Sequence, residues 1–155
     1  MRRPEILLPN AGAPLLNHPV FSEVGELLGF MSIEEGGQLL VGRWVGDFDA
    51  DKVAAAIGVT LDMIPLGPCR AVLTDGSGAT GDWSELVPWM QYDMLPRLVE
   101  LGVNLVAKVR SADPAARLAH QDYARFAARY ISIRLFDDPH SARTWLRQML
   151  AEQQG

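Results

Sequence analysis

The pattern of apolar and polar positions predicts strands and helices that alternate along most of the chain. Two apolar runs within residues 28–48 flank Gly36-Gly37, and this arrangement predicts a β-hairpin because both glycines can take a positive φ. Short apolar runs further along the chain predict buried strands. These strands are expected at residues 71–74, 103–109 and 131–136.

Helices are predicted between and after these strands, where apolar residues recur every three or four positions. Asp49, Asp113 and Asp138 each precede such a segment, and aspartate is favoured there because its carboxylate accepts the free amide hydrogens of the first turn. The central helix has a clear core-facing stripe. It consists of Trp83, Val87, Met90, Met94 and Leu98.

The predicted order β-β-α-β-α-β-α-β-α indicates an α/β fold. An N-terminal antiparallel hairpin followed by parallel β-α units gives a mixed sheet of four to five strands covered by helices. Residues 25–155 are expected to form this single domain. Residues 1–24 contain four prolines and scattered aliphatic residues, so we expect an extended arm that lies on the domain or on a second subunit of a homo-oligomer.

Composition favours a soluble globular protein. The chain has 155 residues, of which 48% are hydrophobic and 21% charged, and it contains one cysteine, Cys69, which excludes a disulfide framework. The first apolar stretch is too short for a signal peptide and no run is long enough for a membrane span, so a cytoplasmic location is expected. The net charge of −5 comes from residues 1–75 and gives no support to nucleic-acid binding.

The string G-x-G-x-x-G at Gly76, Gly78 and Gly81 raises the alternative of a small nucleotide-binding protein or enzyme. We expect residues 75–81 to form a turn before the central helix. Asp75 and Asp82 flank this turn, however, and their carboxylates would repel a phosphate. The glycines are therefore interpreted as a requirement of tight backbone geometry.

No coherent set of catalytic residues is predicted. Ser77 has Asp75 where a nucleophile elbow requires glycine, and no lysine follows the glycine string as a P-loop requires. His18, His120 and His140 are far apart and have no acidic or cysteine partner at metal-ligand spacing, and His120 is expected on a solvated helix face. The sequence thus predicts a non-enzymatic protein without metal or cofactor.

Several of these segments together resemble the SpoIIAA-like branch of the STAS family, which is related in fold to CRAL-TRIO lipid-binding domains. The resemblance covers roughly residues 30–150. It is carried by Val72-Leu73-Thr74-Asp75, Trp89, Pro96, Gly102 with Leu105-Val106-Ala107, and Phe136-Asp137-Asp138 with Ala142 and Trp145-Leu146. It implies a mixed sheet covered by helices, and a regulatory domain that binds a protein partner or a small apolar or lipidic ligand.

The resemblance also implies where a ligand or a switch would lie. Anti-sigma-factor antagonists of this family are switched by phosphorylation of a serine at the start of the helix after the third strand. Here that neighbourhood offers hydroxyl groups but lacks the D-S-S-G string, and aromatic residues of the following helix could line a pocket. The candidate ligand or switch site consists of Asp75, Ser77, Thr80, Asp82, Trp83, Ser84, Trp89 and Tyr92.

Overall fold

A computed structural model describes residues 15–154 and contains one six-stranded mixed sheet with the order β1-β2-β3-β4-β5-β6. The β1-β2 and β2-β3 pairs are antiparallel, and the β3-β4, β4-β5 and β5-β6 pairs are parallel. The α/β class and the mixed sheet are as predicted. The strands are β1 (Leu15–Phe21), β2 (Leu27–Glu34), β3 (Leu39–Asp47), β4 (Ala71–Thr80), β5 (Leu105–Val109) and β6 (Ser132–Phe136).

The sheet has one strand more than expected, because β1 forms within the segment that was predicted to be an extended arm. Pro19 lies in β1 opposite Phe30. Proline lacks an amide donor, and a strand at the edge of a sheet tolerates this because one of its sides has no partner strand. Ser32 on β2 also holds β1, since its Oγ accepts a hydrogen bond of 2.9 Å from the amide of Asn17. Residues 1–14 of the predicted arm lie outside the described residues.

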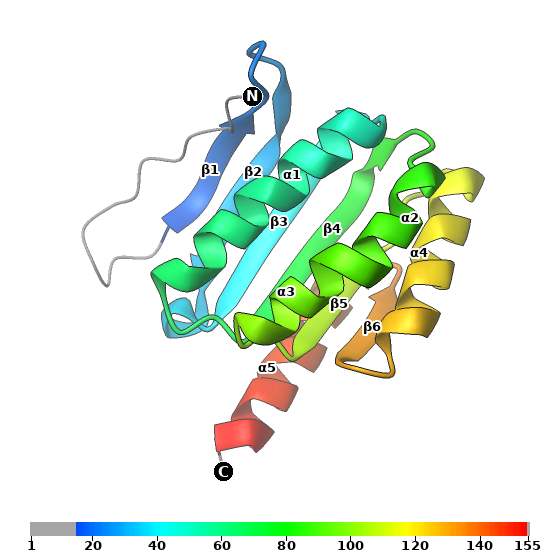
Figure 1. Ribbon diagram of the computed structural model, residues 1–155. Coiled ribbons are helices and arrows are strands. Elements are labelled where there is room, and N and C mark those ends of the chain that lie inside the picture. The colour runs from blue at the N-terminus through cyan, green and yellow to red at the C-terminus, as the bar shows by residue number, and fades with distance from the viewer. Residues whose placement is uncertain (1–14, 155) are drawn as a thin grey trace.

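Helices cover both faces of the sheet (Figure 1). The helices α1, α3 and α4 lie on one face, together with the short segments next to α3, and α5 lies on the other. Three short 3-10 turns, η1 (Glu35–Gly37), η2 (Ile64–Leu66) and η3 (Ser84–Leu86), and the π-helical η4 (Met90–Met94) complete the structure. The α-helices are α1 (Ala50–Met63), α2 (Val87–Trp89), α3 (Leu95–Glu100), α4 (Pro114–Ala127) and α5 (Pro139–Gln154).

The central strands β4 and β5 supply side chains to two separate apolar clusters. In β5, Val106 packs toward α1, α3 and α4, whereas Leu105 and Ala107 pack with Leu146 of α5. Alternation along the strand requires this division, because successive side chains point to opposite faces of a sheet. The residues of β5, and those of β4 up to Gly76, can therefore be assigned to one face of the sheet from their positions.

The predicted caps are confirmed at the starts of the long helices. Asp49 Oδ1 accepts a hydrogen bond of 2.9 Å from the Lys52 amide, and Asp113 Oδ1 accepts one of 3.1 Å from the Ala115 amide. Asp138 likewise accepts one of 2.8 Å from the amide of Ser141. Each cap satisfies an amide that has no partner within its helix.

The predicted turn over residues 75–81 is wrong. Strand β4 continues through Thr80, and Gly78 and Thr80 pair with Val45 and Asp47 of β3 beyond a local shift in register. A glycine at position 78 suits this extended backbone, since a Cβ there would lie 3.2 Å from the carbonyl oxygen of Trp44. The chain turns only at Gly81, which has a φ of +110°.

The predicted central helix is interrupted rather than regular. It consists of η3, α2, η4 and α3, and the π-helical turn η4 ends two residues before Pro96 on α3. Proline cannot donate a hydrogen bond to the preceding turn, so an altered helical geometry beside it is expected. The predicted stripe nevertheless faces the core, since Met90, Met94 and Leu98 are all buried.

Among residues 15–154, no helix combines the length and apolar character that crossing a bilayer requires.

Candidate functional site

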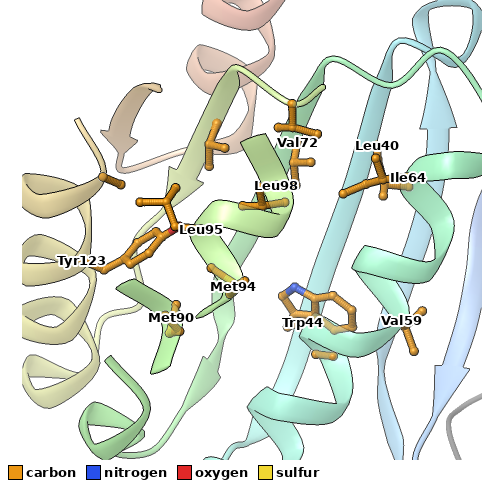
Figure 2. Packing of buried hydrophobic residues seen from close by; sticks show 14 of the residues in the cluster. Leu40, Trp44, Val59, Ile64, Val72, Met90, Met94, Leu95, Leu98 and Tyr123 are labelled. Atoms are coloured by element: carbon orange, nitrogen blue, oxygen red, sulfur yellow. The ribbon is translucent and has the colours of Figure 1, made fainter. Parts of the chain in front are cut away.

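A cavity of about 110 Å³ lies between the sheet and the helices α1, α3 and α4, on the face opposite α5. Strands β3, β4 and β5 form its floor, and α1, η4, α3 and α4 form its sides. Figure 2 shows several of the contributing side chains converging from the strands and helices on this layer. Much of the apolar wall consists of Trp44, Val72, Met90, Met94, Leu98 and Val106.

Glycines in β2 and β3 allow Trp44 to lie flat on the sheet. A Cβ at Gly42 would lie 2.7 Å from the indole atom Cζ2, and a Cβ at Gly29 would lie 2.8 Å from Cε3. Both distances are shorter than carbon atoms tolerate, so the ring occupies space that a larger residue would fill. Gly76 adds further room to the floor of the cavity at β4.

Lys108 on β5 brings a basic group to this apolar cavity. The residue lies in the buried run Leu105–Val109, is only 6% exposed, and points to the cavity side of the sheet together with Val106. Its Nζ lies 5.1 Å from the centre of the Tyr123 ring on α4. Burial lowers the pKa of Lys108 to about 8, because the charged form loses its hydration.

His120 and Tyr123 on α4 place two further polar groups beside Lys108. The Nδ1 atom of His120 and the hydroxyl of Tyr123 are buried, and neither has a hydrogen-bond partner among the described residues. Burial lowers the pKa of His120 to about 3, with a smaller contribution from the positive charge of Lys108, so the imidazole is neutral near pH 7. Burial raises the pKa of the Tyr123 phenol, which stays protonated.

The segment after β4 closes one end of the cavity. The Trp83 ring lies edge-on to the imidazole of His120, with 4.8 Å between the ring centres. Ser111 Oγ donates a hydrogen bond of 2.7 Å to the carbonyl oxygen of Ala79, and Asp113 Oδ2 accepts one of 3.1 Å from the Gly81 amide. These bonds hold the end of β4 against the start of α4, and so fix Trp83 over His120.

Two of the eight predicted site residues, Thr80 and Trp83, line this cavity. Trp89 is half-buried and packs against the apolar cluster of the same face, but it is not part of the cavity wall. Tyr92 is 71% exposed, and its ring lies edge-on to Phe126 with 5.2 Å between the centres. The predicted aromatic pocket of Trp83, Trp89 and Tyr92 is therefore not formed by these three residues.

The other four predicted residues lie away from the cavity. Asp75 follows Leu73 in alternation and so faces the α5 side of the sheet, where its charge helps to raise the pKa of Arg143 after the larger effect of Glu34. Asp75 Oδ1 accepts a hydrogen bond of 2.7 Å from the hydroxyl of Ser77. Asp82 and Ser84 lie in the exposed segment before α2, where Asp82 Oδ1 accepts a bond of 3.0 Å from the Ser84 amide.

The hydroxyl groups of the candidate switch have acidic neighbours. Ser77 donates to Asp75, and Thr80 Oγ1 donates a hydrogen bond of 3.1 Å to Asp47 Oδ1. A phosphate on either hydroxyl would meet a carboxylate at close range. The alternative of nucleotide binding also lacks its predicted geometry, since Gly76 and Gly78 belong to a strand and no helix begins at residue 81.

The sequence-based prediction missed three residues of the cavity, Lys108, His120 and Tyr123, as site residues. His120 was predicted on a solvated helix face, but it is buried and faces the same interior as Ala116 and Tyr123. A signal was present in each case. Lys108 is a charge inside an apolar run that was itself predicted to be a buried strand, and His120 lies three residues before Tyr123, a spacing that places both side chains on one face of a helix.

The chemistry that the cavity offers is binding through apolar contacts and a few polar groups. No carboxylate lies among the described residues of its wall, and no group of three or more His, Cys, Asp or Glu side chains within residues 15–154 is arranged to hold a metal ion. Comparison of the chain with protein-family models, curated proteins and solved structures found no match.

Proposed function

We propose that the chain is a non-enzymatic binding domain that takes a small apolar ligand into the cavity between the sheet and helices α1, α3 and α4. The observation that carries this proposal is the cavity itself, whose wall is mostly aliphatic and aromatic and contains a few buried polar groups. Ligand sites in proteins commonly have this composition, since apolar contacts supply affinity and isolated polar groups fix orientation.

The size of the cavity indicates the size of the ligand. Apolar cavities of about 150 Å³ in proteins bind benzene, and the cavity here has about 110 Å³. A ring of about that size, or a short branched chain, fits this space better than a long-chain lipid does. The proposal therefore narrows the predicted apolar or lipidic ligand to a small molecule.

The unpartnered polar atoms also support a binding role. A buried hydroxyl without a hydrogen-bond partner costs about 1–3 kcal/mol, and Tyr123 has such a hydroxyl next to the cavity. A ligand that bonds to this group would remove the cost. A chain selected only for stability gains nothing from a tyrosine here, because phenylalanine fills the same volume without a polar atom.

Thermal unfolding in the presence of a panel of small aromatic and branched aliphatic compounds tests the proposal. A ligand at about 100 times its dissociation constant stabilises the native state by about 2.7 kcal/mol, so binding raises Tm. Absence of a shift with every member of the panel, together with absence of a bound small molecule in native mass spectrometry of the freshly purified protein, would refute it.

Two threonines provide a matched pair of variants for this experiment. Thr60 on α1 lines the cavity and donates a hydrogen bond of 2.9 Å to the carbonyl of Ala56. Thr144 on α5 makes the same kind of bond, of 3.0 Å, to the carbonyl of His140 on an exposed surface. Thr60→Phe should fill the cavity and abolish the ligand-induced shift, whereas Thr144→Phe should retain it.

The predicted membership of the STAS family and a regulatory role in the cytoplasm stay proposals beside this one. They are supported by the residues that carry the resemblance and by the mixed sheet. The resemblance also implies that the domain binds a protein partner. Affinity capture with the wild-type chain and with Thr60→Phe tests whether a partner depends on the cavity. A partner that binds only when the cavity holds its ligand would be captured by the wild type and not by the variant.

A homo-oligomer formed through the N-terminal segment is likewise proposed from the sequence alone. Its test compares the solution mass of the full chain with that of a chain beginning at Leu15, which retains β1. A lower mass for the shortened chain supports the contact, and an equal mass with an equal Tm counts against it.

A further inference from the structure

The most unusual feature of the cavity is an ammonium group without a counterion. Lys108 has no ion pair or hydrogen bond among the described residues, and its Nζ lies over the face of the Tyr123 ring. The face of an aromatic ring attracts a cation more weakly than a carboxylate does. Charges in protein interiors are generally paired with an opposite charge. The site is therefore built with an uncompensated positive charge.

We propose that the ligand is a small apolar carboxylic acid, whose carboxylate binds Lys108 and whose hydrocarbon part occupies the cavity. This inference rests on the proposed function and names the chemical class of its ligand. Tyr123 lines the same cavity, and its hydroxyl, which has no partner among the described residues, is proposed to donate a hydrogen bond to the second carboxylate oxygen. Charge-assisted bonds of this kind are stronger than those between neutral groups.

The charges that surround Lys108 favour an anion over any other ligand class. Strands β3 and β4 and helices α1, η4 and α3 contribute no titratable side chain to the cavity wall, and α4 contributes only the neutral His120 and Tyr123. The nearest carboxylate of β4, Asp75, faces the opposite side of the sheet. A bound carboxylate would thus bring a negative charge to a cavity wall that has none of its own.

The lysine is protonated under the conditions in which such a ligand is also ionised. The pKa of Lys108, lowered by burial to about 8, leaves the ammonium form predominant at neutral pH. A small carboxylic acid is fully ionised there. Above about pH 8 the free protein loses this proton, so the affinity for a carboxylate should fall by about tenfold for each further pH unit.

The chain offers an internal control for this inference, because it contains only two lysines, Lys52 and Lys108. Lys52 lies at the surface and forms an ion pair of 2.8 Å with Glu26. Lys108→Met replaces the ammonium by an apolar group of similar length, and Lys52→Met makes the same change outside the cavity. A carboxylate bound at Lys52 would respond to the second variant and not to the first, and one bound at a surface arginine would respond to neither.

The test is a calorimetric or NMR titration with butanoate, 3-methylbutanoate and benzoate, each beside its neutral amide. At pH 7 the carboxylate should bind at least about tenfold more tightly than the amide of the same shape. Lys108→Met should abolish this preference and Lys52→Met should leave it unchanged. If Lys108→Met does not fold, the loss of carboxylate affinity above about pH 8 in the wild-type chain, with unchanged amide affinity, serves in its place.

The outcomes separate this inference from the function on which it rests. Equal or tighter binding of the amides would overturn the carboxylate while leaving the cavity as a ligand site. A preference for carboxylate that survives Lys108→Met, or that shows no loss above about pH 8, would also overturn it. Failure of all six compounds to bind, with no shift for the wider apolar panel, would refute the proposed function as well.

Discussion

The Nζ atom of Lys108 on β5 lies 5.1 Å from the centre of the Tyr123 ring on α4, and this pair joins the sheet to a helix through a buried charge. The two residues meet at a cavity whose described wall contains no carboxylate. A buried ammonium without an anionic partner destabilises the folded state, and the same loss of hydration lowers the pKa of Lys108. The free-energy cost of burying Lys108 can be tested by unfolding experiments without a ligand.

Lys108→Met should increase the free energy of unfolding near pH 7 by about 3 kcal/mol. The value follows from the lowering of the lysine pKa from 10.5 to about 8, because each pKa unit corresponds to about 1.4 kcal/mol. The sign follows from proton binding. Between about pH 8 and pH 10.5 the unfolded chain holds a proton that the folded chain has lost, so the wild type gains stability as pH rises. Urea unfolding of both proteins at several pH values measures the gain.

Two other groups oppose this gain at the upper end of the range. Burial raises the pKa of Cys69 from 9.0 to about 11 and also raises that of Tyr123, so both favour the folded state less as pH rises. They are present in wild type and variant alike, and the difference between the two proteins isolates Lys108. A difference that does not change with pH would contradict the burial of its charge.

Acid should weaken the fold through His120. The pKa of this buried imidazole is lowered from 6.5 to about 3. Below about pH 6.5 the unfolded chain therefore binds a proton that the folded chain does not bind. The contribution of His120 is complete above that pH and is lost as pH falls toward 3, with a loss of about 2 kcal/mol by about pH 5. His120→Phe should reduce this loss in chemical denaturation experiments, and the exposed His140→Phe should not.

Gly81→Ala should be markedly more destabilising than Gly46→Ala. Both glycines have a positive φ, of +110° and +90°, but a Cβ at Gly81 would collide with the carbonyl oxygen of Phe48 whereas a Cβ at Gly46 meets nothing within 4 Å. The backbone cost of about 1–2 kcal/mol applies to both variants. The excess for Gly81 in denaturant unfolding measures the close approach of the chain after β4 to the connection between β3 and α1, and equal costs would rule it out.

Leu146→Ala should reduce stability without affecting the cavity. Leu146 is fully buried between α5 and the sheet, and removal of such a side chain costs about 3 kcal/mol or more. Its cluster lies on the face opposite the cavity, so any small apolar ligand should bind the folded variant with unchanged affinity. Gln148→Ala, at an exposed position of α5, is the control. A loss of affinity in Leu146→Ala would show that the two faces are coupled.

The mixed sheet and its helices could be predicted because the elements follow local patterns. The Gly-Gly pair places the hairpin, and Asp49 and Asp113 mark the helix starts that the structure shows. Strand β1 was missed because prolines suggest extended chain, and only pairing with β2 turns an extended segment into a strand. The end of β4 was missed for the same reason, since its glycines pair with β3 beyond a shift in register.

The cavity was less accessible to prediction, because it depends on how strands and helices that are far apart in the sequence pack together. Thr80 and Trp83 were selected for their nearness to the glycine string, and both line the wall. Lys108 and His120 are 12 positions apart in the sequence, and a parallel crossover brings them to one side of the sheet. The face to which Asp75 points could have been inferred from alternation, but only if β4 had been extended past Thr74.

The division of β4 and β5 between two faces has a practical consequence for protein engineering. Apart from Lys108 itself, whose replacement by methionine should stabilise the fold, substitutions of the buried residues on the Lys108 side of the sheet will tend to lower stability, as most changes in a packed interior do. The α5 side shares the same strands but uses other side chains, such as Leu105 and Ala107. Improvements there should add to those changes almost independently. Stabilising substitutions under α5 could therefore offset the loss of stability that accompanies changes of ligand preference in the cavity.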